Sequence, residues 1–119
     1  MKKVIFKGAA TAIVTPFISD TNIDEKSFAR LIDWQIEQGT DAIVVCGTTG
    51  EASTMPDEEH IATVKFCVDY VAHRVPVIAG AGSNDTRHGV ELAKRLEQTG
   101  ADALLCVTPY YNKTTQEGL

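Results

Sequence analysis

The sequence predicts an α/β protein with the architecture of the N-terminal half of a TIM (β/α)8 barrel. Four short apolar runs alternate with amphipathic helical segments, and no low-complexity linker interrupts the alternation. The runs are continuously apolar, which is typical of parallel strands covered on both faces. They recur about every 30 residues, which is the spacing of strands along the chain in an eight-stranded barrel of about 250 residues. We therefore expect residues 1–119 to form one partial barrel with four strands, three helices and the start of a fourth helix.

The strands are predicted where Val, Ile, Leu and Ala predominate, at residues 9–14, 42–46, 75–79 and 103–107. The first helix is predicted at residues 24–38, because its apolar side chains repeat at helical spacing and Gly39 follows as a stop. The buried stripe of this helix should consist of Phe28, Leu31, Ile32 and Ile36.

The second helix should follow Thr54 and Pro56, which suit an N-cap and a first helical turn, and should end near His73. The third should start after Asn84 or Asp85 and stop at Gly100. The side chains of these two helices predicted to face the core are Ile61, Val64, Val68, Val71, Leu92, Ala93 and Leu96. A fourth helix should begin at residues 115–117.

A weak internal repeat supports a repeated βα unit. Residues 39–44 and 100–105 share the order helix stop, Asp-Ala, buried strand. A doubly wound sheet would also fit the alternation of strands and helices. However, Asp85 stands in residues 80–85 where the dinucleotide fingerprint GxGxxG needs a glycine. The barrel is therefore favoured.

Composition limits the function classes. Eleven basic and sixteen acidic residues give a net charge of −5 without a Lys/Arg block, so we expect no nucleic-acid partner. The apolar runs are far shorter than the roughly 20 residues that span a bilayer, so we expect no membrane association and a cytoplasmic location. The cysteines are odd in number and lack metal-ligand spacing. We expect no metal and no cofactor, and buried, reduced thiols at Cys46, Cys67 and Cys106.

Chemistry is expected in the loops at the carboxyl ends of the strands, where barrel enzymes hold their active sites. In residues 47–51, GTTGE, two glycines let the backbone turn tightly and leave peptide N–H groups uncovered, while Thr48 and Thr49 add hydroxyls. Such a nest suits a small carboxylate better than a phosphate, since no lysine or arginine adjoins it. The alternative is a plain strand-to-helix turn whose threonines cap the next helix.

Few of the other ionisable residues are candidates for an acid, a base or a nucleophile. The phenol of a tyrosine has a pKa of about 10, so Tyr111 can act as an acid or base only in a relay with another hydroxyl, for which Thr48 is a candidate. Tyr110 and Tyr111 could instead be simple rim aromatics. No lysine falls in a predicted strand, so no Schiff-base nucleophile is visible. A surface position is predicted for the three histidines, His60, His73 and His88.

Four motifs, AIVTPF, GTTGEAST, PVIAGAGSND and VTPYYNKTTQEGL, resemble the dihydrodipicolinate synthase branch of the pyruvate-dependent aldolase family. The resemblance covers only the N-terminal half of that family's barrel and stops before its Schiff-base lysine, so we expect a fragment that is inactive alone. For the complete protein it implies a lyase of lysine biosynthesis with pyruvate and L-aspartate 4-semialdehyde as partners. Pyruvate, held as an enamine on lysine, would condense with the semialdehyde to 4-hydroxy-tetrahydrodipicolinate.

The resemblance also implies roles for individual residues. Thr49 would bind the pyruvate carboxylate, and Thr48 and Tyr111 would belong to a proton relay. Tyr111 would reach into the site of a neighbouring subunit in a homodimer or homotetramer. Lysine-regulated members bind lysine at positions matched here by Ser53, His60, Asn84, His88 and Tyr110. Because His88 replaces the carboxylate that holds the ligand's ammonium group there, we expect weak feedback by lysine.

Two other interpretations stay open. Another aldolase of the same family, such as a sialic-acid or keto-deoxy-sugar acid lyase, would share the pyruvate site, although GTT at residues 47–49 and YYN at residues 110–112 favour the synthase branch. The chain could also be a non-catalytic, carboxylate-binding half barrel, or a half-barrel product without function.

Overall fold

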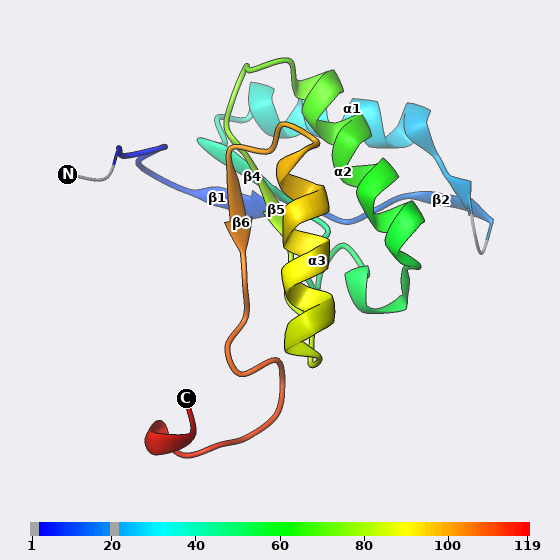
Figure 1. Cartoon of the computed structure of the whole chain (residues 1–119). Helices are drawn as coiled ribbons and strands as arrows, with labels where there is room; N and C mark the ends of the chain where they lie inside the picture. Colours follow the sequence, from blue (N-terminus) through cyan, green and yellow to red (C-terminus); the bar gives the residue numbers. More distant parts are fainter. Residues whose placement is uncertain (1–2, 20–21) are drawn as a thin grey trace.

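The computed structural model describes residues 3–19 and 22–119. Its main feature is a parallel sheet of four strands, β1 (Ala10–Ala12), β4 (Ala42–Val45), β5 (Val77–Gly80) and β6 (Ala103–Leu105). Three helices connect the strands: α1 (Glu25–Glu37), α2 (Asp57–Val71) and α3 (Thr86–Glu97). The helices lie to one side of the sheet, and the chain after β6 extends away from it (Figure 1).

The strand order excludes the doubly wound alternative. The strands lie side by side as β1-β4-β5-β6, which is also their order along the chain. A doubly wound sheet reverses its strand order at a switch point and carries helices on both faces. Here the buried side chains of all three helices join those of the sheet in one core cluster. Consecutive parallel strands with helices on one face are the arrangement of a βα barrel.

Helix α1 forms as predicted. Asp24 caps it by accepting a hydrogen bond from the Ser27 backbone N–H at 3.0 Å. Of the predicted apolar stripe, Phe28 and Ile32 are fully buried, and the other two side chains are partly buried against the core. Helix α3 also starts as predicted, because the Asp85 side chain accepts from the Arg87 N–H at 2.9 Å.

The start of helix α2 differs from the prediction. Its N-cap is Pro56, so the prediction that Thr54 caps this helix is wrong. Thr54 ends a short 3-10 turn, η1 (Ala52–Thr54), and its hydroxyl donates to the Glu51 carbonyl at 3.0 Å. Three acidic residues occupy the first turn of α2. Their charge compensates the positive end of the helix dipole, so the helix begins without a side-chain cap.

The strands are shorter than predicted. β1 and β6 lie at the edges of the sheet, and within the described residues each pairs with one neighbouring strand only. Their backbone hydrogen bonds therefore stop where that neighbouring strand ends. β5 begins at Val77, two residues later than predicted, because Pro76 has no N–H to donate to a ladder. A small antiparallel hairpin, β2 (Phe17–Ser19) with β3 (Asn22–Ile23), was not predicted. The predicted fourth helix is only a 3-10 turn, η2 (Gln116–Gly118).

The internal repeat has a structural basis. Gly39 and Gly100 both end a helix with a left-handed backbone, at φ 90° and 89°, which glycine adopts without strain. The aspartates that follow play matching roles: Asp41 accepts from the Ala9 N–H at 2.8 Å, and Asp102 from the Val77 N–H at 2.9 Å. Each carboxylate thus binds the backbone near the start of the preceding strand in the sheet.

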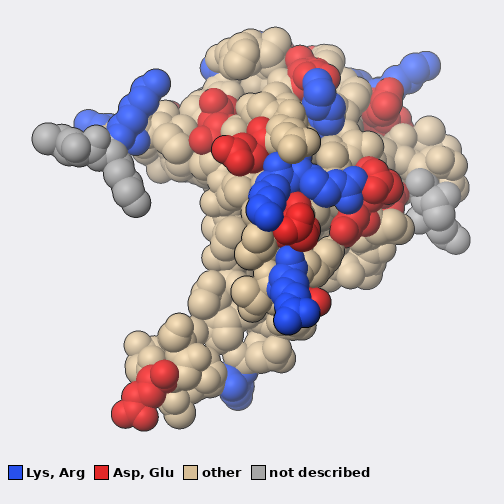
Figure 2. Space-filling view, viewed as in Figure 1, with Lys and Arg blue, Asp and Glu red and all other residues tan. Residues whose placement is uncertain are grey.

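The two faces of the sheet differ in exposure. The face covered by the helices is closely packed, whereas apolar side chains at the strand ends on the other face stay exposed, such as Val14 at 51% and Leu105 at 44%. Charged side chains of both signs are interspersed over the helices in the view of Figure 2. None of the helices among residues 3–19 and 22–119 is both long and apolar enough to cross a bilayer.

Candidate functional site

The loop after β4 leaves backbone donors uncovered. The Gly47 carbonyl accepts the Gly50 N–H at 3.0 Å, and the Thr48 carbonyl accepts the Glu51 N–H at 3.0 Å, which closes a tight turn. Within the described part of the chain, the N–H groups of Thr48 and Thr49 have no acceptor. Both threonines are exposed. The turn therefore presents two peptide N–H groups and the Thr49 hydroxyl to a ligand, which is the donor set predicted for a carboxylate.

Close backbone packing holds this loop in place. A Cβ atom at Gly80 would lie 1.9 Å from the Cys46 carbonyl oxygen, so only glycine lets the end of β5 approach the end of β4. Cys46 itself has a left-handed backbone with φ 51°, which turns the chain out of β4. The buried hydroxyl of Thr15 donates to the Gly50 carbonyl at 2.8 Å. The loop is thus fixed from the ends of both neighbouring strands.

Tyr111 comes from the loop after β6 and meets this turn. Its phenol oxygen forms a hydrogen bond with the Thr48 hydroxyl, although the two residues are 63 positions apart. The Tyr110 ring packs edge-on against the Tyr111 ring, with centroids 5.1 Å apart and planes at 86°. The structure therefore brings together the two predicted relay hydroxyls, and it does so within a single chain. The predicted placement of Tyr111 in a neighbouring subunit stays a prediction.

His60 is buried, so the prediction of a surface position for it is wrong. Its ring Nε2 lies 2.8 Å from the Gly80 carbonyl oxygen. Burial lowers the pKa of His60 from its ordinary value, which favours the neutral ring with the proton on Nε2, where it donates to Gly80. The burial of His60 could have been predicted from the sequence, since His60 lies on the same face of the helix as Val64, Cys67 and Val71. His73 and His88 are exposed, as predicted.

The cysteines divide into two groups. Cys46 and Cys67 are buried as predicted, and burial raises the pKa of each thiol to about 12, so both stay protonated. Cys106 is exposed, and the prediction that it is buried is wrong. It follows the edge strand β6, which pairs with β5 on one side only among the described residues. Among the described residues, no group of three or more His, Cys, Asp or Glu side chains could hold a metal ion.

A cavity of about 300 Å³ lies between the start of α2 and the start of α3, next to the η1 turn that follows the GTTGE loop. His88 points its Nε2 to the Asp57 carboxylate at 2.9 Å and its Nδ1 to the Ser83 hydroxyl at 2.9 Å. Sequence analysis missed Asp57, which is the first residue of α2. The residues matched by resemblance to a lysine site all line this cavity: Ser53, His60, Asn84, His88 and Tyr110.

The described lysines offer no buried amine. Lys3, Lys7, Lys26, Lys65, Lys94 and Lys113 are all exposed. Lys2 lies outside the described residues. The described chain therefore supplies no desolvated nucleophile for a Schiff base beside the uncovered N–H groups and the paired hydroxyls.

Comparisons with known proteins agree with the predicted resemblance. The model of the dihydrodipicolinate synthetase family matches residues 5–119. The 4-hydroxy-tetrahydrodipicolinate synthase of Acetivibrio thermocellus is 60% identical over 119 residues, which is 100% of this chain and 40% of the relative. The dihydrodipicolinate synthase of Acinetobacter baumannii, solved with pyruvate, is 52% identical with a TM-score of 0.87, covering 97% of this chain and 39% of that one.

A prophage protein of the dihydrodipicolinic acid synthase family from Escherichia coli K12, also solved with pyruvate, is 35% identical with a TM-score of 0.88. The match covers 98% of this chain and 39% of that protein. The chain thus spans about 40% of the length of the relatives it matches. The predicted fold, the N-terminal half of a (β/α)8 barrel, is confirmed.

Proposed function

Because the chain belongs to the dihydrodipicolinate synthetase family, we propose that it forms the N-terminal part of a 4-hydroxy-tetrahydrodipicolinate synthase. That enzyme would condense pyruvate, bound as an enamine on a lysine, with L-aspartate 4-semialdehyde. The lysine would come from the part of the barrel that this chain does not match. We place the complete enzyme in the cytoplasm as a homodimer or homotetramer.

The observation that carries this proposal is the pairing of Thr48 with Tyr111 beside the uncovered N–H groups of the turn. The Thr48 and Thr49 N–H groups and the Thr49 hydroxyl would hold the carboxylate of pyruvate. The carboxylate is acceptor-only, so it matches a set of donors without needing a cation. Its fixed position would leave the keto carbon facing the barrel interior, where the lysine amine attacks.

The hydroxyl pair would move protons during the reaction. Schiff-base formation and enamine formation each require a proton to leave one atom and reach another, and a hydroxyl that both donates and accepts can pass it on. Thr48 stands between the carboxylate donors and Tyr111, so it would connect the bound pyruvate to the phenol. This arrangement supports proton transfer without metal ligands or an ionised side chain in the described loop.

A chimaera tests the proposal directly. This chain is joined to the part of the Acetivibrio thermocellus relative that it does not match, and the product is assayed with pyruvate and aspartate semialdehyde. We expect synthase activity, and Thr49→Val should raise the KM for pyruvate by about tenfold through loss of one hydrogen bond to a charged group. A chimaera that folds like the relative but does not condense the two substrates would contradict the proposal.

Subunit mixing tests the relay and the placement of Tyr111. In the chimaera, Thr48→Val and Tyr111→Phe should each lower kcat by about 10² to 10⁴, the scale of proton transfer by a positioned group. If Tyr111 acts across a subunit boundary, exchanging subunits between the two variants creates one intact site per heterodimer and activity returns. If it acts within its own chain, as the contact in this structure allows, the exchanged mixture stays as slow as its parents.

A further inference from the structure

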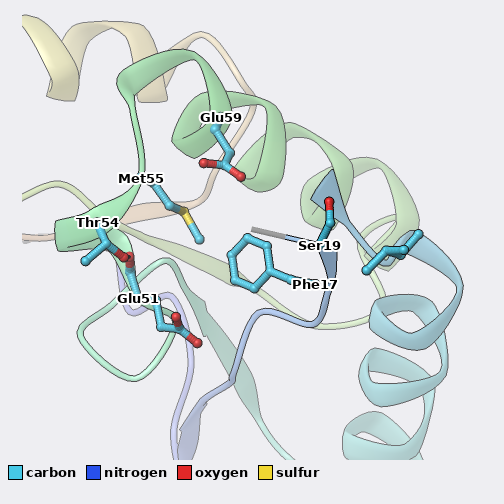
Figure 3. Close-up of a pocket in the computed structure, with 7 residues that line it drawn as sticks. Phe17, Ser19, Glu51, Thr54, Met55 and Glu59 are labelled. Carbon is cyan, nitrogen blue, oxygen red and sulfur yellow. The ribbon is translucent and has the colours of Figure 1, made fainter. Parts of the chain in front are cut away.

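A separate, open pocket of about 460 Å³ is lined by three segments: the β2 strand, residues 51–55 around the η1 turn, and the first turn of α2. Figure 3 shows the Glu59 carboxylate pointing from α2 toward the Phe17 ring and the Met55 side chain. Its other lining residues include Ser19, Glu51 and Thr54.

The Glu59 carboxylate is incompletely satisfied. Its Oε1 atom is buried and has no hydrogen-bond partner among the described residues. A buried acceptor without a donor is unfavourable, and native proteins rarely leave one unpaired. Glu51 contributes a second carboxylate, and no basic side chain lines the described part of the pocket. The pocket therefore presents two acidic side chains and lacks the positive partner that would balance them.

The residues that line the pocket indicate which kind of cation it would bind. The volume is many times the roughly 30 Å³ share of one water, so the space accommodates an organic group. Two carboxylates are too few for a metal site, which is consistent with the lack of metal-ligand groups among the described residues. The Phe17 ring and the Met55 thioether suit a weakly hydrated, delocalised cation that stacks on aromatic faces.

We propose that this pocket binds a guanidinium group, with Glu59 as its ion-pair partner and Phe17 as the ring against which it stacks. The planar guanidinium supplies parallel N–H donors to a carboxylate, and one of them would satisfy the buried Oε1 atom. The group could belong to a free small molecule or to the arginine of a polypeptide. This site is independent of the proposed condensation, since none of the pocket residues belongs to the hydroxyl pair or to the uncovered N–H groups.

Met55 makes a direct test possible. With 13C-methyl methionine, its methyl group reports from inside the pocket. Methylguanidinium chloride is titrated at constant ionic strength, with methylammonium chloride as the comparison. We expect a saturable shift of the Met55 methyl resonance and tighter binding of methylguanidinium than of methylammonium. A folded chain without a saturable Met55 shift, or one that binds both cations equally, would overturn the proposal.

Matched variants identify the partner residue. Glu59→Gln keeps the shape and removes the charge, so it should weaken methylguanidinium binding by about tenfold or more. Glu58→Gln, the exposed neighbour on the same helix, should bind like the wild type. If Glu59→Gln fails to fold, Phe17→Leu keeps both carboxylates and should weaken binding severalfold. Unchanged affinity in a folded Glu59→Gln chain, or in a folded Phe17→Leu chain, argues against the assignment.

One further titration identifies the source of the cation by comparison with the first. An end-blocked Gly-Arg-Gly peptide carries the guanidinium on a polypeptide, and methylguanidinium carries it on a small molecule. Both belong to the proposed chemistry. A peptide that binds as tightly as methylguanidinium indicates a protein-borne arginine, whereas a peptide at least tenfold weaker indicates a free small molecule.

Discussion

Gly80 is the position where one added methyl group should disturb both the fold and the site. In Gly80→Ala, the new Cβ would lie 1.9 Å from the Cys46 carbonyl oxygen, 2.7 Å from the Cys46 carbonyl carbon and 3.0 Å from the Gly47 nitrogen. Since Cβ atoms do not approach neighbours closer than 3.0 Å, the ends of β4 and β5 must separate by at least about 1.1 Å. All three neighbours are backbone atoms, so no side-chain rotation relieves the contact.

Two consequences follow from this displacement. Overpacking against rigid backbone costs about 1 to 3 kcal/mol, so the free energy of unfolding should fall by that amount. The shift also moves the turn that carries Thr48 and Thr49, and a displacement of about 1 Å in a positioned group lowers rates by about 10². We therefore expect a lower urea midpoint for the chain and a loss of about 10² in kcat/KM for the chimaera.

Gly89→Ala is the matched control. Gly89 lies inside α3, and its added Cβ would meet the Ser83 Cβ at 3.5 Å and the Ser83 nitrogen at 3.8 Å, both ordinary contacts. Alanine favours a helix interior over glycine, so this variant should gain about 0.5 to 1 kcal/mol. The free energies of unfolding of Gly80→Ala and Gly89→Ala are both measured by urea denaturation monitored with circular dichroism. If Gly80→Ala keeps wild-type stability and the chimaera keeps full activity, the inferred close packing of β4 and β5 is refuted.

Four further outcomes are expected. Pyruvate with borohydride should leave no adduct on the isolated chain by mass spectrometry, because every described lysine is exposed. The isolated chain should self-associate through the unpaired edges of β1 and β6, so a single 12.9 kDa species in sedimentation velocity would contradict this. His60 has a pKa below its unfolded value of about 6.5, so its contribution to stability is complete above about pH 6.5 and declines as the pH falls toward the folded pKa. The difference in urea midpoint between the wild type and His60→Gln should therefore shrink with acidification, and a difference that is constant between pH 8 and pH 5 would contradict this assignment. Lysine should inhibit the chimaera weakly, because the nearby Asp57 carboxylate is already engaged by His88, and His88→Glu should strengthen the inhibition in initial-rate assays.

Three of the four predicted helices are present in the structure, and their prediction rested on short-range chemistry. Asp24 and Asp85 cap their helices through N–H groups two or three residues away, and Gly39 and Gly100 end helices through their own backbone freedom. Such interactions depend on neighbours along the chain, so the order of residues reveals them. The GTTGE turn was predictable for the same reason, because two glycines and two threonines act within five residues.

Two of the three failed residue predictions, those for His60 and Cys106, concern residues whose environment comes from elsewhere in the chain. Thr54 is a residue type that favours the N-cap, but in the η1 turn its hydroxyl donates a hydrogen bond to the Glu51 carbonyl instead. His60 looked like a surface histidine until packing of α2 on the sheet brought it to the Gly80 carbonyl. Cys106 resembled a buried strand residue, but its strand is at the edge of the sheet. For His60 and Cys106 a long-range contact, or its lack, outweighed the local pattern, whereas for Thr54 one local hydrogen bond replaced another.

The sequence by itself determined the alternation of strands and helices, the ends of α1 and α3 and the donor-rich turn of the site, because these depend on periodicity and on the conformational preferences of adjacent residues. Only the tertiary structure decided that the Thr48 and Tyr111 hydroxyls meet across 63 positions, that Gly80 must lack a side chain, and that Glu59 and Phe17 line one pocket. These contacts require distant segments to be placed within a few ångströms, and that placement results from packing of the whole core rather than from any local stretch of residues.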